Sequence, residues 1–340
     1  KEKRNMILPY RSTIVRCLLL MTGCMIFLLL RPPQSHPSSQ DHGKRRLKIP
    51  SADEFPDRDI SEDLAKLSYA IYKIKDGTDP QSVMPDGYVA QSYMDFSNPS
   101  PDTEALIVTT TNNNNSKNSA SDIIVVFRGT ESADDWDTNL DATPVMGRFD
   151  NSPSSVRVHR GFQDAAFVTV DVLEDNLRDV LERVFGDGTS TNLENFADGN
   201  IYITGSSLGG ALAHIVGTHL ADRYRGQQFR VINFGAPRFG NQSFKRWSEG
   251  TLDNLSIWRF VNRADAVPRL FRVYSHAGHL FQIWRRSSAA YYRQVGGDGY
   301  EGVPFHWHFG SSIIQHQIAA YVEFFEEKSS MSRYWATNFE

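Results

Sequence analysis

The sequence predicts an α/β protein in which helices flank a mostly parallel central sheet. Short β-branched runs alternate with longer stretches whose apolar residues recur at helical spacing, and this alternation is typical of strand–helix–strand units with parallel strands. The chain has 340 residues, of which 40% are hydrophobic and 22% charged, so it can build the large core that such a sheet requires.

Two helices and a pair of strands are expected between residues 60 and 185. Residues 60–73 place apolar side chains at helical spacing behind Ser61, which we expect to cap the helix. The β-branched residues 105–111 and 122–129 predict neighbouring strands joined by an asparagine-rich, low-complexity loop. Residues 174–185 predict an amphipathic helix.

The second half repeats the alternation of strand and helix. A strand over residues 200–205 is followed directly by a helix over residues 207–224. Further strands are expected at residues 230–236 and 255–262, and the last helix at residues 311–327.

The stretch WRRSSAAYYR, residues 284–293, interleaves aromatic residues with arginines. We favour a solvated loop for this stretch, and contact with a membrane surface is the alternative.

The charge and the cysteine content argue against nucleic-acid binding and against disulfide or cysteine-metal sites in the main part of the chain. The net charge of −4 argues against a general nucleic-acid binder, which needs a basic face to replace the counterions of the phosphates. The two cysteines, Cys17 and Cys24, both lie in the apolar N-terminal run. A disulfide framework or a cysteine metal site is therefore not expected in the folded domain.

The N-terminal segment, residues 1–30, is first basic and then apolar. We expect either a cleaved signal or transit peptide or an uncleaved membrane anchor over residues 14–30, which just reach the shortest membrane-spanning length. A linker rich in proline, serine and basic residues follows over residues 31–50, and one domain is expected over residues 51–340. This organisation predicts a protein of the secretory pathway or one anchored to a membrane. The sequence does not identify the compartment.

Two adjacent serines lie in the stretch GSSLGG, where a predicted strand meets a predicted helix. A serine in such a turn can serve as a nucleophile when glycines two residues to either side relieve the crowding of the strained backbone. Ser207 has Gly205 and Gly209 at those positions, whereas Ser206 has larger residues there. Ser207 is therefore the predicted nucleophile.

An acid and a base are expected later in the chain, in that order. Asp265 directly follows a predicted strand, in the position of the acid. His276 and His279 precede an apolar run, so they would enter a parallel sheet at the edge opposite to the active site. His308 and His316 remain almost equally good candidates for the base from the residues alone.

Several segments resemble the class 3 (fungal-type) lipases of the α/β-hydrolase superfamily, and they occur in the order of that family. They are IIVVFRGTESADDWDTNL, VHRGF, ITGSSLGGALA, NFGAPRFGNQSF, FVNRADAVPRL, YSHAGHLF and HQIAAYV. The resemblance implies the α/β-hydrolase fold, with a mostly parallel central sheet and a single catalytic domain that carries a short lid.

The resemblance also implies roles for individual residues. It identifies Ser207, Asp265 and His316 as the catalytic triad. It prefers His316 to His308 because of the spacing to a later tyrosine, and it gives His276 a structural role.

The oxyanion hole implied by the resemblance consists of the backbone N–H of Leu208 and of Thr130 in the RGT turn. Two positions depart from the pattern of the family. Ser206 stands where histidine is common, and Gln315 stands where aspartate is often found. Neither is a triad position.

The implied lid covers residues 131–147. Ala133, Trp136 and Leu140 share one face of a helix there, and three aspartates lie elsewhere on it. An amphipathic lid fits an enzyme that opens at a lipid surface. A docked helix with a solvated acidic face is the alternative, and so acidic a lid also suits soluble esters.

The function expected from all of these features is hydrolysis of carboxylic esters, with acylglycerols as the first choice of substrate. The alternatives are phospholipid, galactolipid or feruloyl-type soluble esters, and a catalytically inactive scaffold with the same fold. No cofactor and no metal are required. Expected partners are a lipid or other ester, and the surface of a membrane or lipid droplet, but not nucleic acid.

Overall fold

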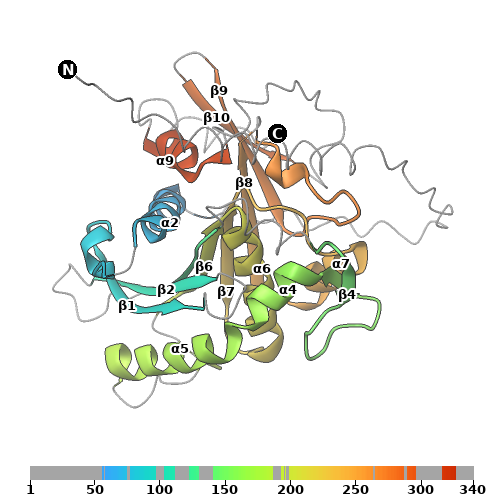
Figure 1. Cartoon of the computed structure of the whole chain (residues 1–340), viewed down its shortest axis with the longest axis horizontal. Helices are drawn as coiled ribbons and strands as arrows, with labels where there is room; N and C mark the ends of the chain where they lie inside the picture. Colours follow the sequence, from blue (N-terminus) through green and yellow to red (C-terminus); the bar gives the residue numbers. More distant parts are fainter. Residues whose placement is uncertain are drawn as a thin grey trace, which may run out of the picture. The chain divides into compact units, whose positions relative to one another are not determined.

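Eight strands form one sheet among the residues that the computed structural model describes (Figure 1). They are β1 (Tyr88–Asp95), β2 (Glu104–Thr110), β3 (Ile123–Phe127), β6 (Ile201–Ser206), β7 (Phe229–Phe234), β8 (Leu255–Asn262), β9 (His279–Arg286) and β10 (Ala289–Val295). Across the sheet the order is β1-β2-β3-β6-β7-β8-β9-β10. Strands β3, β6, β7, β8 and β9 run parallel, whereas β1, β2 and β10 run antiparallel to their neighbours. The predicted mostly parallel sheet is confirmed.

The described residues are 56, 58–74, 77–96, 103–111, 122–129, 141–186, 193–194, 196, 199–262, 265–286, 289–295 and 316–326. All of the helices and strands named here belong to one unit, Arg58–Glu340. The predicted N-terminal segment over residues 1–30 and the linker over residues 31–50 lie outside the described residues.

Six helices accompany the sheet in the described part of the chain. They are α2 (Arg58–Ala70), α4 (Arg160–Phe167), α5 (Val170–Phe185), α6 (Leu208–Arg223), α7 (Gln242–Thr251) and α9 (Ile318–Glu326). Short 3₁₀ turns occur at η2 (Ile71–Lys73), η3 (Pro80–Val83) and η4 (Val267–Arg269). A small separate sheet consists of β4 (Pro144–Met146) and β5 (Arg157–His159).

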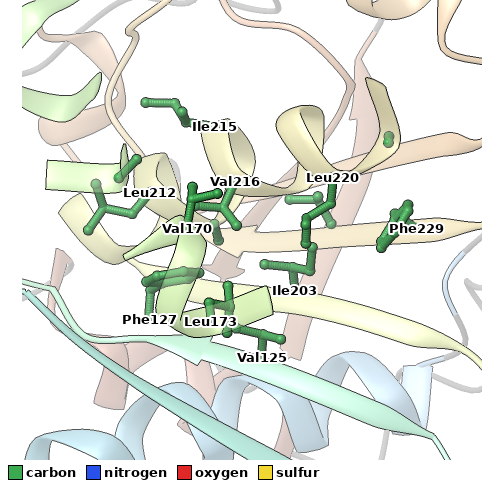
Figure 2. Close-up of a cluster of buried hydrophobic side chains, with 14 of the residues drawn as sticks. Val125, Phe127, Val170, Leu173, Ile203, Leu212, Ile215, Val216, Leu220 and Phe229 are labelled. Carbon is green, nitrogen blue, oxygen red and sulfur yellow. The ribbon is translucent and has the colours of Figure 1, made fainter. Parts of the chain in front are cut away.

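The main core lies between the sheet and helices α5 and α6. Figure 2 shows Val125, Phe127 and Ile203 of the strands gathered with Leu173 of α5 and Val216 of α6. These five side chains are fully buried. Helix α2 packs against β6 and against α9 and covers the other face of the sheet. Because both faces are covered, β3 is buried along its whole length and reads as a continuous apolar run.

Two helices begin earlier than the sequence predicts. Helix α2 starts at Arg58, and Ser61 is a fully buried residue inside it, so the expectation that Ser61 caps the helix is wrong. Asp59 lies in the first turn instead, where a carboxylate suits the positive end of the helix. Helix α5 starts at Val170 rather than Glu174 because buried Val170 extends its apolar stripe by one turn.

The expectation of a loop over residues 284–293 is also wrong. Most of these residues belong to β9 and β10, which pair antiparallel at the edge of the sheet. The aromatic residues that suggested a surface contact are also residues that favour strands. Strand β1 has no counterpart among the predicted elements and extends the other edge by pairing with β2.

No helix within the described part of the chain has both the length and the apolar character needed to cross a membrane.

Candidate active site

Ser207 occupies the sharp turn between β6 and α6. Strand β6 ends at Ser206 and helix α6 begins at Leu208, so one residue makes the whole connection. Ser207 has φ 56° and ψ −128°, and a positive φ is uncommon for a residue with a side chain. Its own N–H donates to the Phe234 carbonyl oxygen of β7 over 2.9 Å, which helps to hold the strained turn.

Glycines on both sides of Ser207 are required by close approach of the backbone. A Cβ atom on Gly205 would lie 2.5 Å from the carbonyl carbon and oxygen of Gly209. A Cβ atom on Gly209 would lie 2.3 Å from the carbonyl oxygen of Phe127, at the end of β3. Both distances are shorter than real Cβ contacts, so the predicted need for glycine two residues either side of Ser207 is confirmed.

His316 links Ser207 to Asp265 by hydrogen bonds. Its Nε2 lies 2.8 Å from Ser207 Oγ, and its Nδ1 lies 2.9 Å from Asp265 Oδ2 and 3.0 Å from Oδ1. Ser207 is 7% exposed and Asp265 is fully buried, while the His316 side chain is 18% exposed. The three residues that the sequence analysis selected therefore lie in one chain of hydrogen bonds.

Asp265 is held in place by two further donors. The backbone N–H of Val267 donates to Oδ1 over 2.9 Å, and the hydroxyl of Tyr321 donates to Oδ2 over 2.6 Å. The same hydroxyl accepts the backbone N–H of Asn262, the last residue of β8, over 3.0 Å. These two donors fix the direction of the buried carboxylate toward His316.

Tyr321 was missed as a site residue by the sequence analysis, which used this tyrosine only to prefer His316 over His308. Its ring is fully buried against Phe234, while its hydroxyl reaches the acid. The one feature of the sequence that could have identified Tyr321 as a site residue is its position shortly after His316.

The N-terminus of α6 supplies a backbone donor beside Ser207. Leu208 is the first residue of α6, so its N–H has no carbonyl acceptor within the helix. The turn after β3 lies against the same place, since a Cβ on Gly129 would be 2.6 Å from the Ser206 carbonyl oxygen and 3.3 Å from Ser207 Cβ. The parallel pairing of β3 with β6, which sets Phe127 beside Gly205, creates this closeness.

Some of the residues selected from the sequence do not belong to the part of the chain that the structure describes. Thr130, the lid residues Ala133, Trp136 and Leu140, and His308 all lie outside the described residues.

His276 has surroundings that suit a structural role. It is buried, and its Nε2 pairs with the Pro268 carbonyl oxygen over 2.8 Å. Burial lowers the pKa of His276 well below its ordinary value, and the nearby Arg259 charge lowers it further. The ring is therefore neutral over the ordinary pH range and is already hydrogen-bonded to the backbone.

Comparison with known families gives a match over the central part of the chain. Residues 124–275 match a family model described as lipase (class 3). This stretch begins in β3 and ends shortly before β9, so it contains Ser207, Asp265 and the turn that leads to Thr130. His316 lies beyond it.

Two curated relatives align with less than half of the chain. The chloroplastic phospholipase A(1) DAD1 of Arabidopsis thaliana is 29% identical over 159 residues, which cover 44% of this chain and 33% of that protein. A lipase of Rhizomucor miehei is 28% identical over 167 residues, which cover 47% of this chain and 41% of that protein. The matched stretch thus spans well under two thirds of the length of either relative.

Solved structures resemble more of the chain. A triacylglycerol lipase from Penicillium expansum superimposes with a TM-score of 0.55 at 19% identity, covering 71% of this chain and 86% of that one. At this identity the likeness concerns the fold, and it confirms the predicted α/β-hydrolase architecture.

Proposed function

We propose, from the class 3 lipase domain that this chain carries over residues 124–275, that the protein is a serine carboxylester hydrolase. The observation that carries the proposal is the continuous chain of hydrogen bonds from Ser207 Oγ through His316 to Asp265, over 2.8 and 2.9 Å. A serine becomes a nucleophile when a neighbouring base can take its proton and an acid orients that base.

In the proposed mechanism Ser207 Oγ attacks the carbonyl carbon of the ester while its proton passes to His316 Nε2. Asp265 holds the imidazole by Nδ1 and stabilises the imidazolium that forms. The backbone N–H of Leu208, together with Thr130, would bind the oxyanion. His316 then protonates the leaving alcohol. Water, deprotonated by His316, releases the acid from the acyl-enzyme.

The proposed substrates are acylglycerols. The support is the family match and the relatives named lipase or triacylglycerol lipase. Hydrolysis of phospholipids is the second candidate, because another similar protein is named a phospholipase A(1). Galactolipids and feruloyl-type soluble esters complete the series that an activity panel should contain.

The proposed surface partner is a lipid interface approached through the lid. Ala133, Trp136 and Leu140 are proposed to form the apolar face that meets it. We also propose that residues 14–30 direct the chain to the secretory pathway or anchor it in a membrane. Fractionation of cells that express the full chain, with sequencing of the mature N-terminus, tests whether residues 14–30 are retained.

The central experiment compares the wild type with Ser207→Ala and Ser206→Ala. A fluorophosphonate probe should label the wild type and Ser206→Ala, and it should not label Ser207→Ala. The wild type should hydrolyse esters, Ser206→Ala should do so at a reduced rate, and Ser207→Ala should not, when triacylglycerol, phospholipid and short soluble esters are offered with and without an emulsion. A wild type that neither reacts with the probe nor cleaves any ester would favour the inactive scaffold. A strict preference for dissolved esters would move the substrate away from acylglycerols.

A further inference from the structure

We propose that Tyr72 is a positioning residue that ties the Ser207 turn to the turn after β3 and thereby sets the geometry of the oxyanion site. This inference rests on the proposed function, because it gives Tyr72 a task in ester hydrolysis. Tyr72 belongs to the 3₁₀ turn η2 that follows α2, far from both turns in the sequence.

The first observation is a hydrogen bond at the base of the Ser207 turn. The hydroxyl of Tyr72 lies 3.1 Å from the hydroxyl of Ser206, the residue before Ser207. Ser206 is 3% exposed. Ser206 therefore has a definite partner, and its side chain is held by a residue from a different layer of the fold.

The second observation concerns Gly129, the last described residue of the turn after β3. A Cβ atom at Gly129 would come within 2.2 Å of the Tyr72 hydroxyl oxygen and 2.6 Å of the Ser206 carbonyl oxygen. The hydroxyl thus occupies the space beside Gly129 that a side chain would need. The Tyr72 hydroxyl oxygen therefore contacts both the turn that carries Ser207 and the turn that leads into Thr130.

The third observation is that the ring of Tyr72 is itself fixed. The guanidinium of Arg128 lies over the ring, 5.7 Å from its centroid. Arg128 also makes two hydrogen bonds with the carboxylate of Glu104, a buried residue of β2. On the helix side, α2 is held to β6 by the contact of Ser68 Oγ with Thr204 Oγ1 at 3.3 Å. Tyr72 is therefore contacted at its ring by Arg128, and the helix before it is tied to β6 by Ser68.

The position of Tyr72 matters because the two proposed oxyanion donors belong to different elements. Leu208 opens α6, whereas Thr130 follows β3, so their separation depends on how the two turns contact each other. Preorganised donors act by matching the oxyanion more closely than the ground-state carbonyl. If the contact loosens, the rate of the chemical step should fall while substrate binding changes little.

The experiment replaces Tyr72 by phenylalanine, which keeps the ring and removes the hydroxyl. We expect Tyr72→Phe to lower kcat for a soluble p-nitrophenyl ester by about three- to tenfold with KM nearly unchanged. The inhibition constant of an alkyl trifluoromethyl ketone, which Ser207 would convert into an oxyanion adduct, should rise by a similar factor. The matched control is Tyr69→Phe, one turn earlier on α2, where the side chain is 38% exposed and contacts Lys73.

Ser206 allows the same contact to be removed from its other end. Ser206→Ala should lose activity by a factor close to that of Tyr72→Phe, and Ser206→Thr, which keeps a hydroxyl, should recover most of it. The double variant should be no slower than the slower single variant, since both changes remove one hydrogen bond. Circular dichroism and thermal unfolding establish that each variant is folded, and if Tyr72→Phe does not fold, Ser206→Ala alone decides.

The outcomes separate this inference from the proposed function. Equal kcat and equal ketone inhibition in the wild type, Tyr72→Phe and Ser206→Ala would overturn the role of Tyr72 and leave the hydrolase intact. A rise in KM alone would also overturn it, because that result would assign Tyr72 to substrate binding. A wild type without ester hydrolysis or fluorophosphonate labelling would instead remove the proposed function, and the role of Tyr72 with it.

Discussion

The hydroxyl of Tyr321 donates a hydrogen bond of 2.6 Å to Oδ2 of Asp265. Asp265 lies in the loop after β8, and Tyr321 belongs to α9, so the bond joins the sheet to the last described helix. The same carboxylate oxygen lies 2.9 Å from His316 Nδ1. Tyr321 thus helps to fix the acid in the direction that the base requires.

Removing this hydroxyl should weaken both the site and the fold. We expect Tyr321→Phe to lower the rate of ester hydrolysis by about tenfold. It should also lower the free energy of unfolding by about 1–3 kcal/mol, because a buried carboxylate loses one donor. Steady-state kinetics and urea unfolding measure the two effects. Unchanged values in both assays would contradict the contribution assigned to the bond.

Replacing Asp265 by asparagine tests the proposed tautomer of His316. Asparagine keeps the size of the side chain, but its NH₂ group would donate to Nδ1 and leave the proton on Nε2, facing Ser207. His316 could then no longer accept the serine proton. We expect kcat to fall about 10³- to 10⁴-fold. Residual activity near that of the wild type would show that Asp265 is not the acid.

The crowding around Ser207 predicts a difference between two glycine substitutions. Gly209→Ala puts a Cβ atom 2.3 Å from the Phe127 carbonyl oxygen, so β3 or the Ser207 turn must move. We expect loss of activity and a large fall in thermal stability. Gly250→Ala is the control, because nothing lies within 4 Å of its Cβ position in α7 and alanine favours helix. It should be neutral or stabilising, and equal melting temperatures for the two variants would contradict the contacts described for Gly209.

Buried histidines predict a loss of stability in acid. Burial lowers the pKa of His214 from 6.5 to about 3, and His159 shows a similar shift for the same reason. Both rings stay neutral in the folded protein, whereas the unfolded chain binds protons below pH 6.5. The stability that these two neutral histidines contribute is therefore fully present above pH 6.5 and is lost as the pH drops toward 3. Lowering the pH from 7.5 to 5.5 should lower the free energy of unfolding by about 1 kcal/mol for each of these two histidines.

Urea unfolding of the wild type and of His214→Gln at these two pH values measures the effect. The variant should be less stable at pH 7.5, because glutamine does not fill the space of the imidazole ring. Its free energy of unfolding should fall less between pH 7.5 and 5.5 than that of the wild type, because one buried histidine is missing. An equal pH dependence in both proteins would show that His214 does not carry the effect.

The nucleophilic turn could be predicted because its requirements are local. Ser207 needs glycine two residues away on each side, and the strand and helix around it have clear periodicity. Asp265 could be selected for a similar reason, since it directly follows a strand of strongly apolar residues. Each decision used only a dozen neighbouring residues.

The base could not be selected from the residues alone because its position depends on packing between distant elements. His316 is 109 residues from Ser207 in sequence, and it lies just before α9, which packs against the distant helix α2. The sequence shows neither contact, so His308 and His316 stayed nearly equal until the family resemblance separated them. The hydroxyls of Tyr72 and Tyr321 were missed for the same reason, because their partners Ser206 and Asp265 lie far away in the sequence.

Because α9 packs against α2 and is the last described helix, the proposed site can be completed only late in the synthesis of the chain. In a nascent chain still attached to the ribosome, Ser207 and Asp265 leave the exit tunnel before His316 does. Such a chain holds the nucleophile and the acid but has no base, so the proposed hydrolase would stay inert toward cellular lipids until α9 has emerged and docked.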